Sequence, residues 1–315
     1  KILAIVGPSG GGKTTLLRML AGLETIDSGQ IIYENKEIPL DQMESRNLLG
    51  FVFQDFQLFP HLTVLDNLTL SPIKTMGMSK EDAQKKAQTL LDRLGLGSHG
   101  NAYPYSLSGG QKQRVTLAGV MVGDVDILLF DEPLASLDPA TGKSAIELID
   151  DIQKKTKKTI LIIEHRLEDV LHCSVDRIIV VNEGKIAADI TPEQLLSSNL
   201  LVETGIREPL YITALKYAGC TITPDMHPEH IDTLNIDKCR ENLKKWYEGV
   251  PEDNAAKTEN TILEMKDVKF SYESGKEILH GVSFKVNKGE MVSIVGRNGA
   301  GKSTTLKMLT GMMKP

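Results

Sequence analysis

The sequence predicts an α/β fold, with a mainly parallel β-sheet flanked by helices, a helical insertion and an antiparallel β portion. Two fully apolar segments, "VDILLFDEP" and "KTILIIEHR", are separated by the amphipathic run "GKSAIELIDDIQKK". Continuous apolar strands that alternate with helices are typical of a parallel sheet covered on both faces. Near the start of the sequence, a glycine-rich segment, "GPSGGGKTT", follows the apolar stretch "ILAIV". A near copy, "GRNGAGKST", occurs near the other end of the sequence. Such a distant copy indicates an internal repeat of a whole domain.

The first elements can be placed in order from hydrophobic periodicity. The strand "ILAIV" leads into the glycine-rich loop, and "TLLRMLAGL" follows it as a helix. "GQIIYEN" and "LLGFVFQ" are predicted strands, the second ending at Gln54. The region from about Phe56 to Tyr105 is predicted to be mainly helical. In it, Ser79 is the expected N-cap of a helix whose apolar face comprises Ala83, Ala87, Leu90, Leu91 and Leu94.

The later elements divide the chain into three parts. "RIIVVNEG" and "KIAADI" predict a hairpin that turns at Glu183-Gly184. From about residue 205 to 259 prolines are frequent and periodicity weakens, so we interpret this part as a connector with limited structure of its own around one helix-like stretch, "DKCRENLKKWYEG". New strands start near Ile262, with "ILEMKDVKFSY", "ILHGVSFKV" and "MVSIV". We therefore expect a first domain over 1–204, a connector over 205–259 and the first part of a second domain over 260–315.

Composition narrows the class of protein. The apolar fraction of 41% and the charged fraction of 25% are those of an ordinary globular chain. The net charge of −6 argues against a protein that binds nucleic acid through phosphate contacts. No apolar run approaches the ~18 residues of a membrane helix and no signal pattern is present, so we expect a cytoplasmic or peripheral protein. The 3 cysteines indicate neither a disulfide framework nor a zinc site. "HPEH" at His227–His230 lacks the helical spacing of a metal site.

Both glycine-rich segments fit the phosphate-binding loop, in which a glycine is followed by four residues, Gly-Lys and a hydroxyl residue. Glycines let successive backbone N–H groups converge on phosphate oxygens, and the following helix directs its N-terminus at the anion. A glycine-rich turn without function is the alternative, but strand, loop and helix are all present twice. The expected nucleotide contacts are Gly7, Ser9, Gly10, Gly12, Lys13, Thr14 and Thr15 in the first copy, and Gly296, Asn298, Gly299, Gly301, Lys302, Ser303 and Thr304 in the second. Thr14 and Ser303 are the expected Mg²⁺ ligands.

Other residues complete a phosphoryl-transfer site. Asp131 and Glu132 end a buried strand, where the first can hold Mg²⁺ through water and the second can polarise the attacking water. A solvated turn is the plainer alternative. "LSGGQKQR" places Ser108, Gly109 and Gly110 at a helix N-terminus, a second anion-binding device. Because one nucleotide does not need two such devices from one domain, this helix is expected to face a nucleotide held by another domain.

The set formed by the phosphate loop, Gln54, "LSGGQ", "LLFDEP", "SLD" at Ser136–Asp138 and His165 resembles the P-loop NTPase domain of ATP-binding-cassette (ABC) transporters over residues 1 to 200. The resemblance implies that two domains clamp two ATP molecules head to tail between one phosphate loop and the other domain's "SGGQ". It implies that Gln54 senses the γ-phosphate and Mg²⁺, and that His165 binds the γ-phosphate. The expected nucleotide contacts then also include Ser108, Gly109, Gly110, Gln111, Asp138 and Tyr272, the last as the aromatic that stacks on adenine.

Different stretches of the sequence resemble two different branches of this family. "FVFQDFQLFPHLTVLDNLTLSPIK" is similar to ATPases of polar amino-acid importers, whereas "LAGVMVGDVDILLFDEPLASLDPATG", "IIEHRLEDVL" and "GIREPLYITALKYAG" resemble tandem energy-coupling-factor ATPases for vitamins or metal ions. The repeat favours the second branch. We also expect that, in this sequence, the first domain lacks its beginning and the second lacks its end. A natural recombinant or an assembly artefact would explain the mixture. The resemblance implies transmembrane subunits as partners at the cytoplasmic face of the membrane. A cassette ATPase acting on ribosomes or DNA is a more distant alternative.

Overall fold

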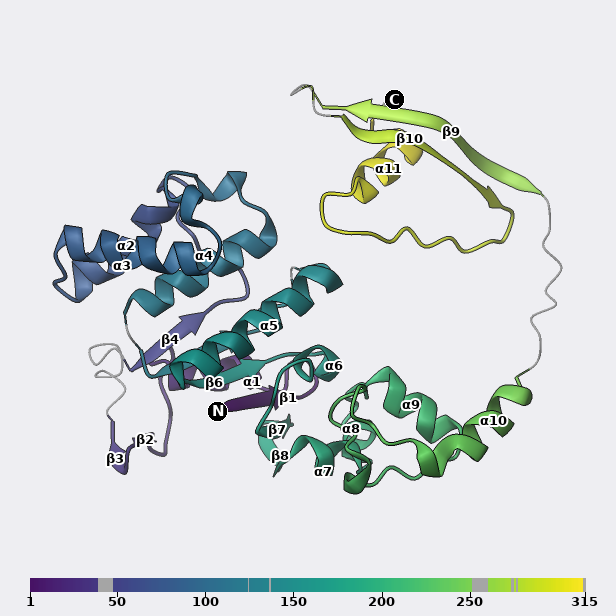
Figure 1. Ribbon diagram of the computed structural model, residues 1–315, viewed down its shortest axis with the longest axis horizontal. Helices are drawn as coiled ribbons and strands as arrows, with labels where there is room; N and C mark the ends of the chain where they lie inside the picture. The colour runs from purple at the N-terminus through teal and green to yellow at the C-terminus, as the bar shows by residue number, and fades with distance from the viewer. Residues whose placement is uncertain are drawn as a thin grey trace. The chain divides into compact units, whose positions relative to one another are not determined.

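A computed structural model of the protein describes residues 1–38, 48–123, 125–135, 137–250, 260–272, 275 and 277–313. The chain forms two units, the first made mainly of Lys1–Leu137 and Thr141–Glu248, and the second mainly of the residues from Gly249 onwards (Figure 1).

A six-stranded sheet organises the first unit, in the order β4-β5-β6-β1-β7-β8. Its strands are β1 (Ile2–Val6), β4 (Leu49–Val52), β5 (Ile127–Asp131), β6 (Thr159–Ile163), β7 (Arg177–Asn182) and β8 (Lys185–Ile190). All neighbours pair in parallel except β7 and β8, which are antiparallel. The predicted α/β fold with a mainly parallel sheet is therefore confirmed. Because parallel strands end at the same edge, the residues that follow β1, β4, β5 and β6 lie along one edge of the sheet.

Two short hairpins supply the antiparallel portion of this unit. The predicted turn between β7 and β8 is confirmed, since Glu183 and Gly184 both have positive φ angles of 49° and 72°. Two left-handed residues in succession give the twist that a two-residue hairpin requires. The predicted strand "GQIIYEN" is confirmed only over β2 (Ile32–Tyr33). Glu34 and Asn35 adopt positive φ angles and turn the chain into β3 (Lys36–Glu37), which pairs antiparallel with β2.

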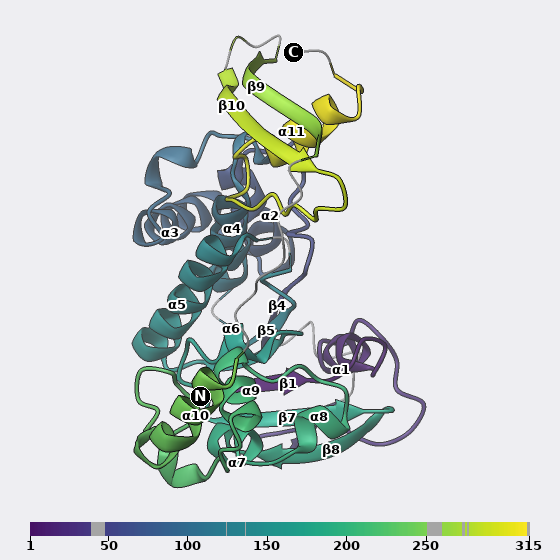
Figure 2. The same ribbon diagram turned by 90° about the vertical axis from the view of Figure 1, so that its right-hand side faces the viewer.

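Helices cover the sheet and form the predicted insertion. The helices of the first unit are α1 (Lys13–Leu20), α2 (Val64–Thr75), α3 (Lys80–Arg93), α4 (Gly109–Val122), α5 (Pro139–Thr156), α6 (Leu167–Val170), α7 (Pro192–Leu196), α8 (Leu200–Glu203), α9 (Leu210–Tyr217) and α10 (Arg240–Glu248). Among them, α2, α3 and α4 pack against one another, and α4 also contacts β4, so their buried side chains join the core under the sheet (Figure 2). Ser79 caps α3 as predicted, because its hydroxyl accepts a hydrogen bond from the Asp82 N–H at 3.1 Å.

The segment over 205–248 has more structure than the sequence predicts. Besides α9 and α10 it contains two short 3₁₀ turns, Pro224–Met226 and Asp237–Cys239. Its buried apolar side chains join the main core of the first unit, and they include Ile212, Leu215, Ile222, Met226 and Cys239. These side chains lie in short elements, and their spacing along the sequence matches neither a helix nor a strand. Hydrophobic periodicity therefore does not predict their burial. The rest of the predicted connector, 251–259, lies outside the described residues.

Two hydrogen bonds fasten this segment to α6. The Nδ1 atom of His230 lies 2.7 Å from the Leu171 carbonyl oxygen, at the end of α6. The Leu210 N–H donates to the carboxylate of Glu168 within α6 at 3.2 Å. The segment is therefore an integral layer of the first unit.

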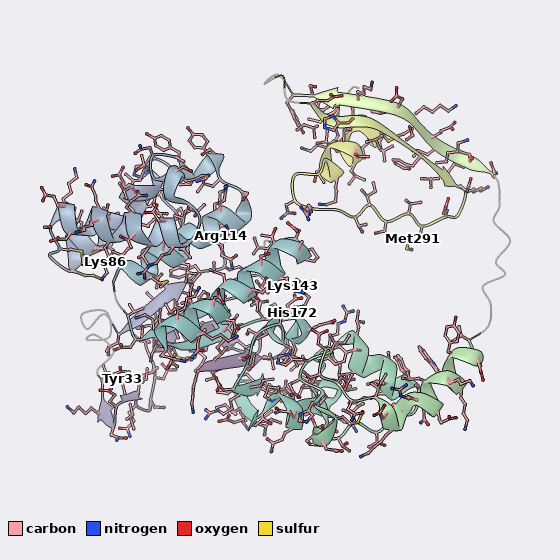
Figure 3. The ribbon with its side chains drawn as sticks, viewed as in Figure 1. Tyr33, Lys86, Arg114, Lys143, His172 and Met291 are labelled. Carbon is pink, nitrogen blue, oxygen red and sulfur yellow. The ribbon has the colours of Figure 1, made fainter. Side chains whose placement is uncertain are left out.

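The second unit contains β9 (Thr261–Ser271) and β10 (Glu277–Asn287), paired antiparallel, and α11 (Lys302–Leu309). The predicted strands "ILEMKDVKFSY" and "ILHGVSFKV" are thus confirmed. The prediction of a strand at "MVSIV" is wrong for this structure, since 291–295 form no strand and Met291 is 97% exposed (Figure 3). In the first unit the matching strand β1 pairs with β6 and β7 on its two sides. No strand of the second unit's described residues offers such a parallel partner.

Candidate nucleotide-binding site

The first glycine-rich loop connects β1 to α1 and has the shape that phosphate binding requires. Gly12 is the N-cap of α1 and has a left-handed φ of 94°, which an L-residue rarely adopts. Gly7 is required for a different reason, because a Cβ atom there would lie 2.2 Å from the Val181 carbonyl oxygen of β7. The loop is therefore pressed onto the neighbouring strand, and its backbone N–H groups precede the positive end of a helix.

Lys13 reaches back across this loop. Its Nζ atom donates to the carbonyl oxygens of Gly7 and Pro8, both at 2.9 Å, and the residue is only 4% exposed. Burial lowers the pKa of Lys13, and the nearby carboxylates of Glu132 and Asp131 partly offset that shift. The ammonium group is thus held at the mouth of the loop, where it can exchange its carbonyl contacts for phosphate oxygens.

Thr14 and Asp131 meet as the sequence predicts for a metal site. The Thr14 hydroxyl donates to Asp131 Oδ1 at 2.9 Å, although the two residues come from α1 and from the end of β5. Burial raises the pKa of Asp131, while the hydrogen bond from Thr14 acts in the opposite direction. A hydroxyl and a buried carboxylate side by side form the hard oxygen donor set that suits Mg²⁺, and a divalent cation would compensate the buried charge.

Glu132 and His165 face each other beside the loop. Glu132 Oε1 lies 2.7 Å from His165 Nε2, which joins the ends of the neighbouring strands β5 and β6. A pocket of about 310 Å³ is lined by the residues from Ser9 to Thr15, by Glu132 and by His165. The structure therefore brings the predicted phosphate contacts together with Glu132 and His165, two of the three predicted catalytic residues, whereas the third, Gln54, does not line this pocket. These phosphate contacts are Ser9, Gly10, Gly12, Lys13, Thr14 and Thr15.

Other residues predicted from the first part of the sequence lie outside that pocket. Gln54 follows β4, the neighbour of β5, so it belongs to the same sheet edge but is exposed. Ser108 and Gln111 form a capping box at the N-terminus of α4, in which the Ser108 N–H donates to Gln111 Oε1 at 2.9 Å. Gly109 and Gly110 begin that helix, and Asp138 directly precedes α5. Ser136 lies outside the described residues.

The second glycine-rich loop repeats the hydrogen bonds of the first. Lys302 Nζ donates to the carbonyl oxygens of Gly296 at 2.7 Å and Arg297 at 2.8 Å, as Lys13 does to Gly7 and Pro8. Gly301 caps α11 with a left-handed φ of 88°. The hydroxyl of Tyr272 lies 3.3 Å from the Thr304 hydroxyl, so the ring is placed next to the helix that follows this loop.

Sequence reasoning missed two buried polar residues behind Glu132. Glu164 is 4% exposed, and its carboxylate accepts a hydrogen bond from the Leu134 N–H at 2.8 Å. Gln113 is 5% exposed, and its amide donates to the Pro133 carbonyl oxygen at 3.2 Å. A glutamate at the end of the otherwise apolar stretch "TILII" was the available signal, since carboxylates are rarely buried without a partner.

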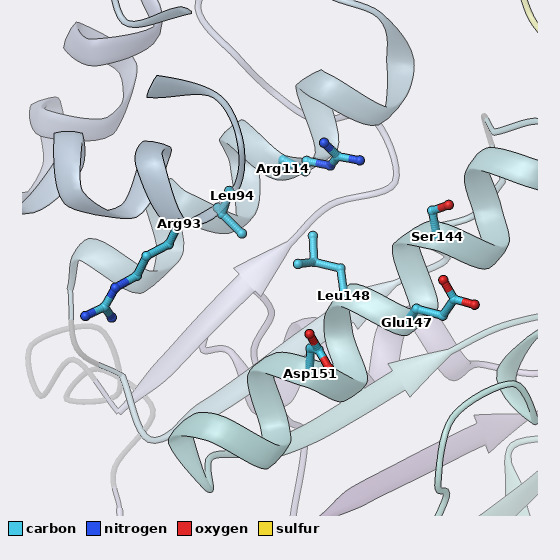
Figure 4. A pocket seen from close by; sticks show the side chains of 7 residues that line it. All are labelled: Arg93, Leu94, Arg114, Ser144, Glu147, Leu148 and Asp151. Carbon is cyan, nitrogen blue, oxygen red and sulfur yellow. The ribbon is translucent and has the colours of Figure 1, made fainter. Parts of the chain in front are cut away.

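Two further hollows lie away from the phosphate loop. A cleft of about 400 Å³ separates Arg93 and Arg114, on α3 and α4, from Glu147 and Asp151 on α5 (Figure 4). A larger groove of about 780 Å³ is formed by β4, the segment that follows it, α2 and α4. Four aromatic side chains line this groove, namely Phe51, Phe53, Phe56 and Phe59.

Comparison with known proteins agrees with this geometry. A family model described as ABC transporter matches residues 1–135 and 279–315, which together exceed half of the chain. A second model, described as ATP-binding cassette cobalt transporter, matches residues 198–270. That match covers the whole of the segment 205–259 that the sequence predicted to be a connector.

Curated relatives extend the match along the whole chain. A Clostridium perfringens protein named as an ABC transporter ATP-binding protein is 50% identical over 317 residues, covering 98% of this chain and 56% of the relative. A Photobacterium profundum protein of the same name is 46% identical over 320 residues, covering 99% and 57%. The chain therefore spans little more than half the length of these relatives.

Solved structures share the fold. The structure of cbiO1 from Clostridium perfringens, described as part of the ABC transporter complex cbiONQ, matches with a TM-score of 0.58 and 29% identity, covering 69% of this chain and 87% of that chain. A dimeric ATP-binding cassette in a post-hydrolysis state, bound to ADP and Pi, matches with a TM-score of 0.54 and 31% identity, covering 61% and 85%. The chain therefore belongs to the ABC transporter family, and its first unit has the fold of a P-loop ABC ATPase.

Proposed function

We propose that this chain is the ATP-binding and ATP-hydrolysing part of an energy-coupling-factor importer for vitamins or metal ions. The observation that carries the proposal is the pocket in which Lys13, the Thr14–Asp131 pair and the Glu132–His165 pair surround one phosphate loop. Each pair joins residues from different strands or helices. Such an arrangement serves phosphoryl transfer, where catalysis depends mainly on positioning and charge.

ATP would bind with its β- and γ-phosphates on the loop. The backbone N–H groups at the start of α1 and the Nζ atom of Lys13 would neutralise the phosphate oxygens. Thr14 and Asp131 are the residues that would hold Mg²⁺, with Gln54 joining them from the end of β4. The metal ion would supply charge neutralisation between the β- and γ-phosphates.

Glu132 would act as the general base for hydrolysis. Its carboxylate would accept a proton from a water molecule aligned with the γ-phosphate. His165, now hydrogen-bonded to Glu132 at 2.7 Å, would turn its Nε2–H towards the γ-phosphate oxygens. The pair could therefore change partners between a resting and a nucleotide-bound state, with His165 as the moving group.

The capped end of α4 would act on a second nucleotide. Ser108, Gly109, Gly110 and Gln111 are absent from the lining of the Lys13 pocket, so they are free to complete the site of another ABC domain. The neighbouring dimeric cassette supports such a pairing. The family match at 279–315 supports a second domain within this protein, with the first over 1–204 and the second starting near 260. Lys302 and Tyr272 would bind the nucleotide of that second domain.

A transmembrane subunit would dock in the aromatic groove beside Gln54. The groove of about 780 Å³ is shaped by the same segment that carries Gln54, which would let the membrane partner sense the nucleotide. Among the described helices none is long and apolar enough to span a bilayer. A peripheral position at the cytoplasmic face would follow from docking alone, without nucleic acid as a partner.

The solute class rests on the segment after β8. The cobalt-transporter model over 198–270 and the likeness to cbiO1, part of cbiONQ, support a vitamin or metal importer. The sequence around β4 resembles ATPases of polar amino-acid importers, and it is the remaining argument for that branch of the family. Copurification of the transmembrane subunits from membranes, followed by uptake of labelled cobalt or vitamins, would decide between the two.

The proposed chemistry is tested with Glu132→Gln in the full-length protein, with Lys302→Ala disabling the second site. The amide preserves shape but accepts no proton, so hydrolysis should fall by 10² to 10⁴, the range that a general base contributes. ATP affinity should be retained, because Lys13 and the loop are untouched. The exposed Glu203→Gln on α8 serves as the matched control. Unimpaired turnover by Glu132→Gln would remove Glu132 from its proposed role.

A further inference from the structure

The turn that carries Glu132 has a shape that must be held by its surroundings. Glu132 has a φ of 49°, a left-handed conformation that is uncommon for any residue other than glycine. Such a residue costs on the order of 1–3 kcal/mol and persists only where neighbouring contacts fix it. What fixes this turn therefore decides where the Glu132 carboxylate points.

Three hydrogen bonds hold the turn from behind. The Glu132 N–H donates to the Ile163 carbonyl oxygen at 3.1 Å, which ties the end of β5 to the end of β6. The Leu134 N–H donates to the Glu164 carboxylate at 2.8 Å. The Pro133 carbonyl oxygen accepts from the Gln113 amide of α4 at 3.2 Å.

Glu164 occupies the central place among these contacts. It directly precedes His165, so one residue fixes the turn after β5 through its side chain and carries the catalytic histidine through its backbone. A carboxyl group at 4% exposure costs stability, and the hydrogen bond from the Leu134 N–H offsets only a part of that cost. The cost is understandable if the contact serves the Glu132–His165 pair.

We propose that Glu164 is a positioning residue for ATP hydrolysis, which holds the Leu134 turn so that the Glu132 carboxylate meets His165. Gln113 supports the same turn from the helix that begins with the "SGGQ" residues. The proposal rests on the proposed ATPase function. It concerns the orientation of the pair and assigns Glu164 no contact with nucleotide.

The test compares Glu164→Ala with Glu164→Gln in the full-length protein carrying Lys302→Ala. Glutamine keeps an oxygen that can accept from the Leu134 N–H, whereas alanine removes the acceptor. A misplacement of about 1 Å can cost on the order of 10²-fold in rate. We expect Glu164→Ala to lower kcat at least tenfold with KM for ATP within about threefold, and Glu164→Gln to restore most of the rate.

Glu208→Ala is the matched control for loss of a buried glutamate. Glu208 is 7% exposed and pairs with Lys216, away from the phosphate loop, so its loss should lower stability without changing kcat per folded molecule. Gln113→Ala provides a second variant should Glu164→Ala fail to fold. It should also lower kcat more than it changes KM.

A second readout separates the proposal from the proposed function. The ¹⁵N resonances of the His165 ring, assigned with His165→Gln, report its contact with Glu132 without requiring turnover. They should shift in Glu164→Ala towards the values of Glu132→Ala, and stay near wild type in Glu164→Gln. Wild-type kcat in Glu164→Ala, or an unchanged His165 spectrum, would overturn the positioning role. A wild-type protein without ATPase activity but with this His165 pattern would instead refute the proposed function alone.

Discussion

Gly7→Ala isolates the close approach between the phosphate loop and β7. Gly7 is not among the glycines with positive φ, so alanine can adopt its backbone conformation without strain. The added Cβ would nevertheless lie 2.2 Å from the Val181 carbonyl oxygen and 3.2 Å from its carbonyl carbon. Ordinary contact distances are about 3.5 Å or more, so loop and strand must separate by about 1 Å. Overpacking of this kind costs about 1–3 kcal/mol.

The same movement should impair nucleotide binding, because the Gly7 carbonyl oxygen is one of the two acceptors that position Lys13. We expect a lower thermal unfolding midpoint, measured by circular dichroism, and at least tenfold weaker Mg·ATP binding by calorimetry with the second site disabled. Gly119→Ala on α4 is the control, since its Cβ would meet nothing within 4 Å and alanine favours a helix by about 0.5–1 kcal/mol. Wild-type stability and affinity in Gly7→Ala would show that the contact with Val181 is not what requires glycine.

Three further outcomes follow from the site. Lys13→Ala should weaken ATP binding at the first loop at least tenfold in calorimetry, since a charge-assisted hydrogen bond contributes about 1.5–3 kcal/mol, and unchanged affinity would contradict this. Tyr272→Ala should weaken binding at the second loop about ten- to a hundredfold through lost stacking, measured with Lys13→Ala silencing the first site; an equal affinity would exclude the tyrosine. Burial raises the pKa of Glu164 from 4.5 to about 7, against a lowering by the Leu134 N–H, with Asp169 and Glu132 raising and Arg166 lowering it. Because the pKa of Glu164 is higher in the folded than in the unfolded protein, the free energy of unfolding is highest below pH 4.5, and it falls by about 3 kcal/mol as the pH rises through about 7. Glu164→Gln should remove this pH dependence, measured by urea titrations at several pH values.

The phosphate loop and the sheet could be predicted from sequence because their signals are local. Each parallel strand is a short apolar run between polar or turn-forming residues. The loop is recognised from glycines and one lysine at fixed spacings in the sequence. The edge at which Asp131, Glu132 and His165 meet also follows, since each of them ends a strand predicted to be parallel. These inferences need only the hydrophobic periodicity of the sequence and the geometry of a parallel sheet.

The residues that were missed depend on contacts between distant parts of the chain. Glu164 is informative only once its carboxylate is seen to accept the Leu134 N–H of another strand end. The packing of 205–248 depends on Cys239, Met226 and Ile212 reaching a core built by earlier elements. The "MVSIV" stretch has the composition of a strand, yet a strand needs partners, and the described part of the second unit provides none.

The contact between Gly7 and Val181 also has a consequence for the order in which the protein is made. The glycine-rich motif precedes β5, β6 and β7 in the chain, so it leaves the ribosome before the strand that supports the loop has been synthesised. A nascent chain therefore contains the complete motif before β7, the strand against which the loop packs, has been synthesised. Nucleotide that binds only the supported loop would favour chains in which β7 has docked, and would act as a late folding ligand.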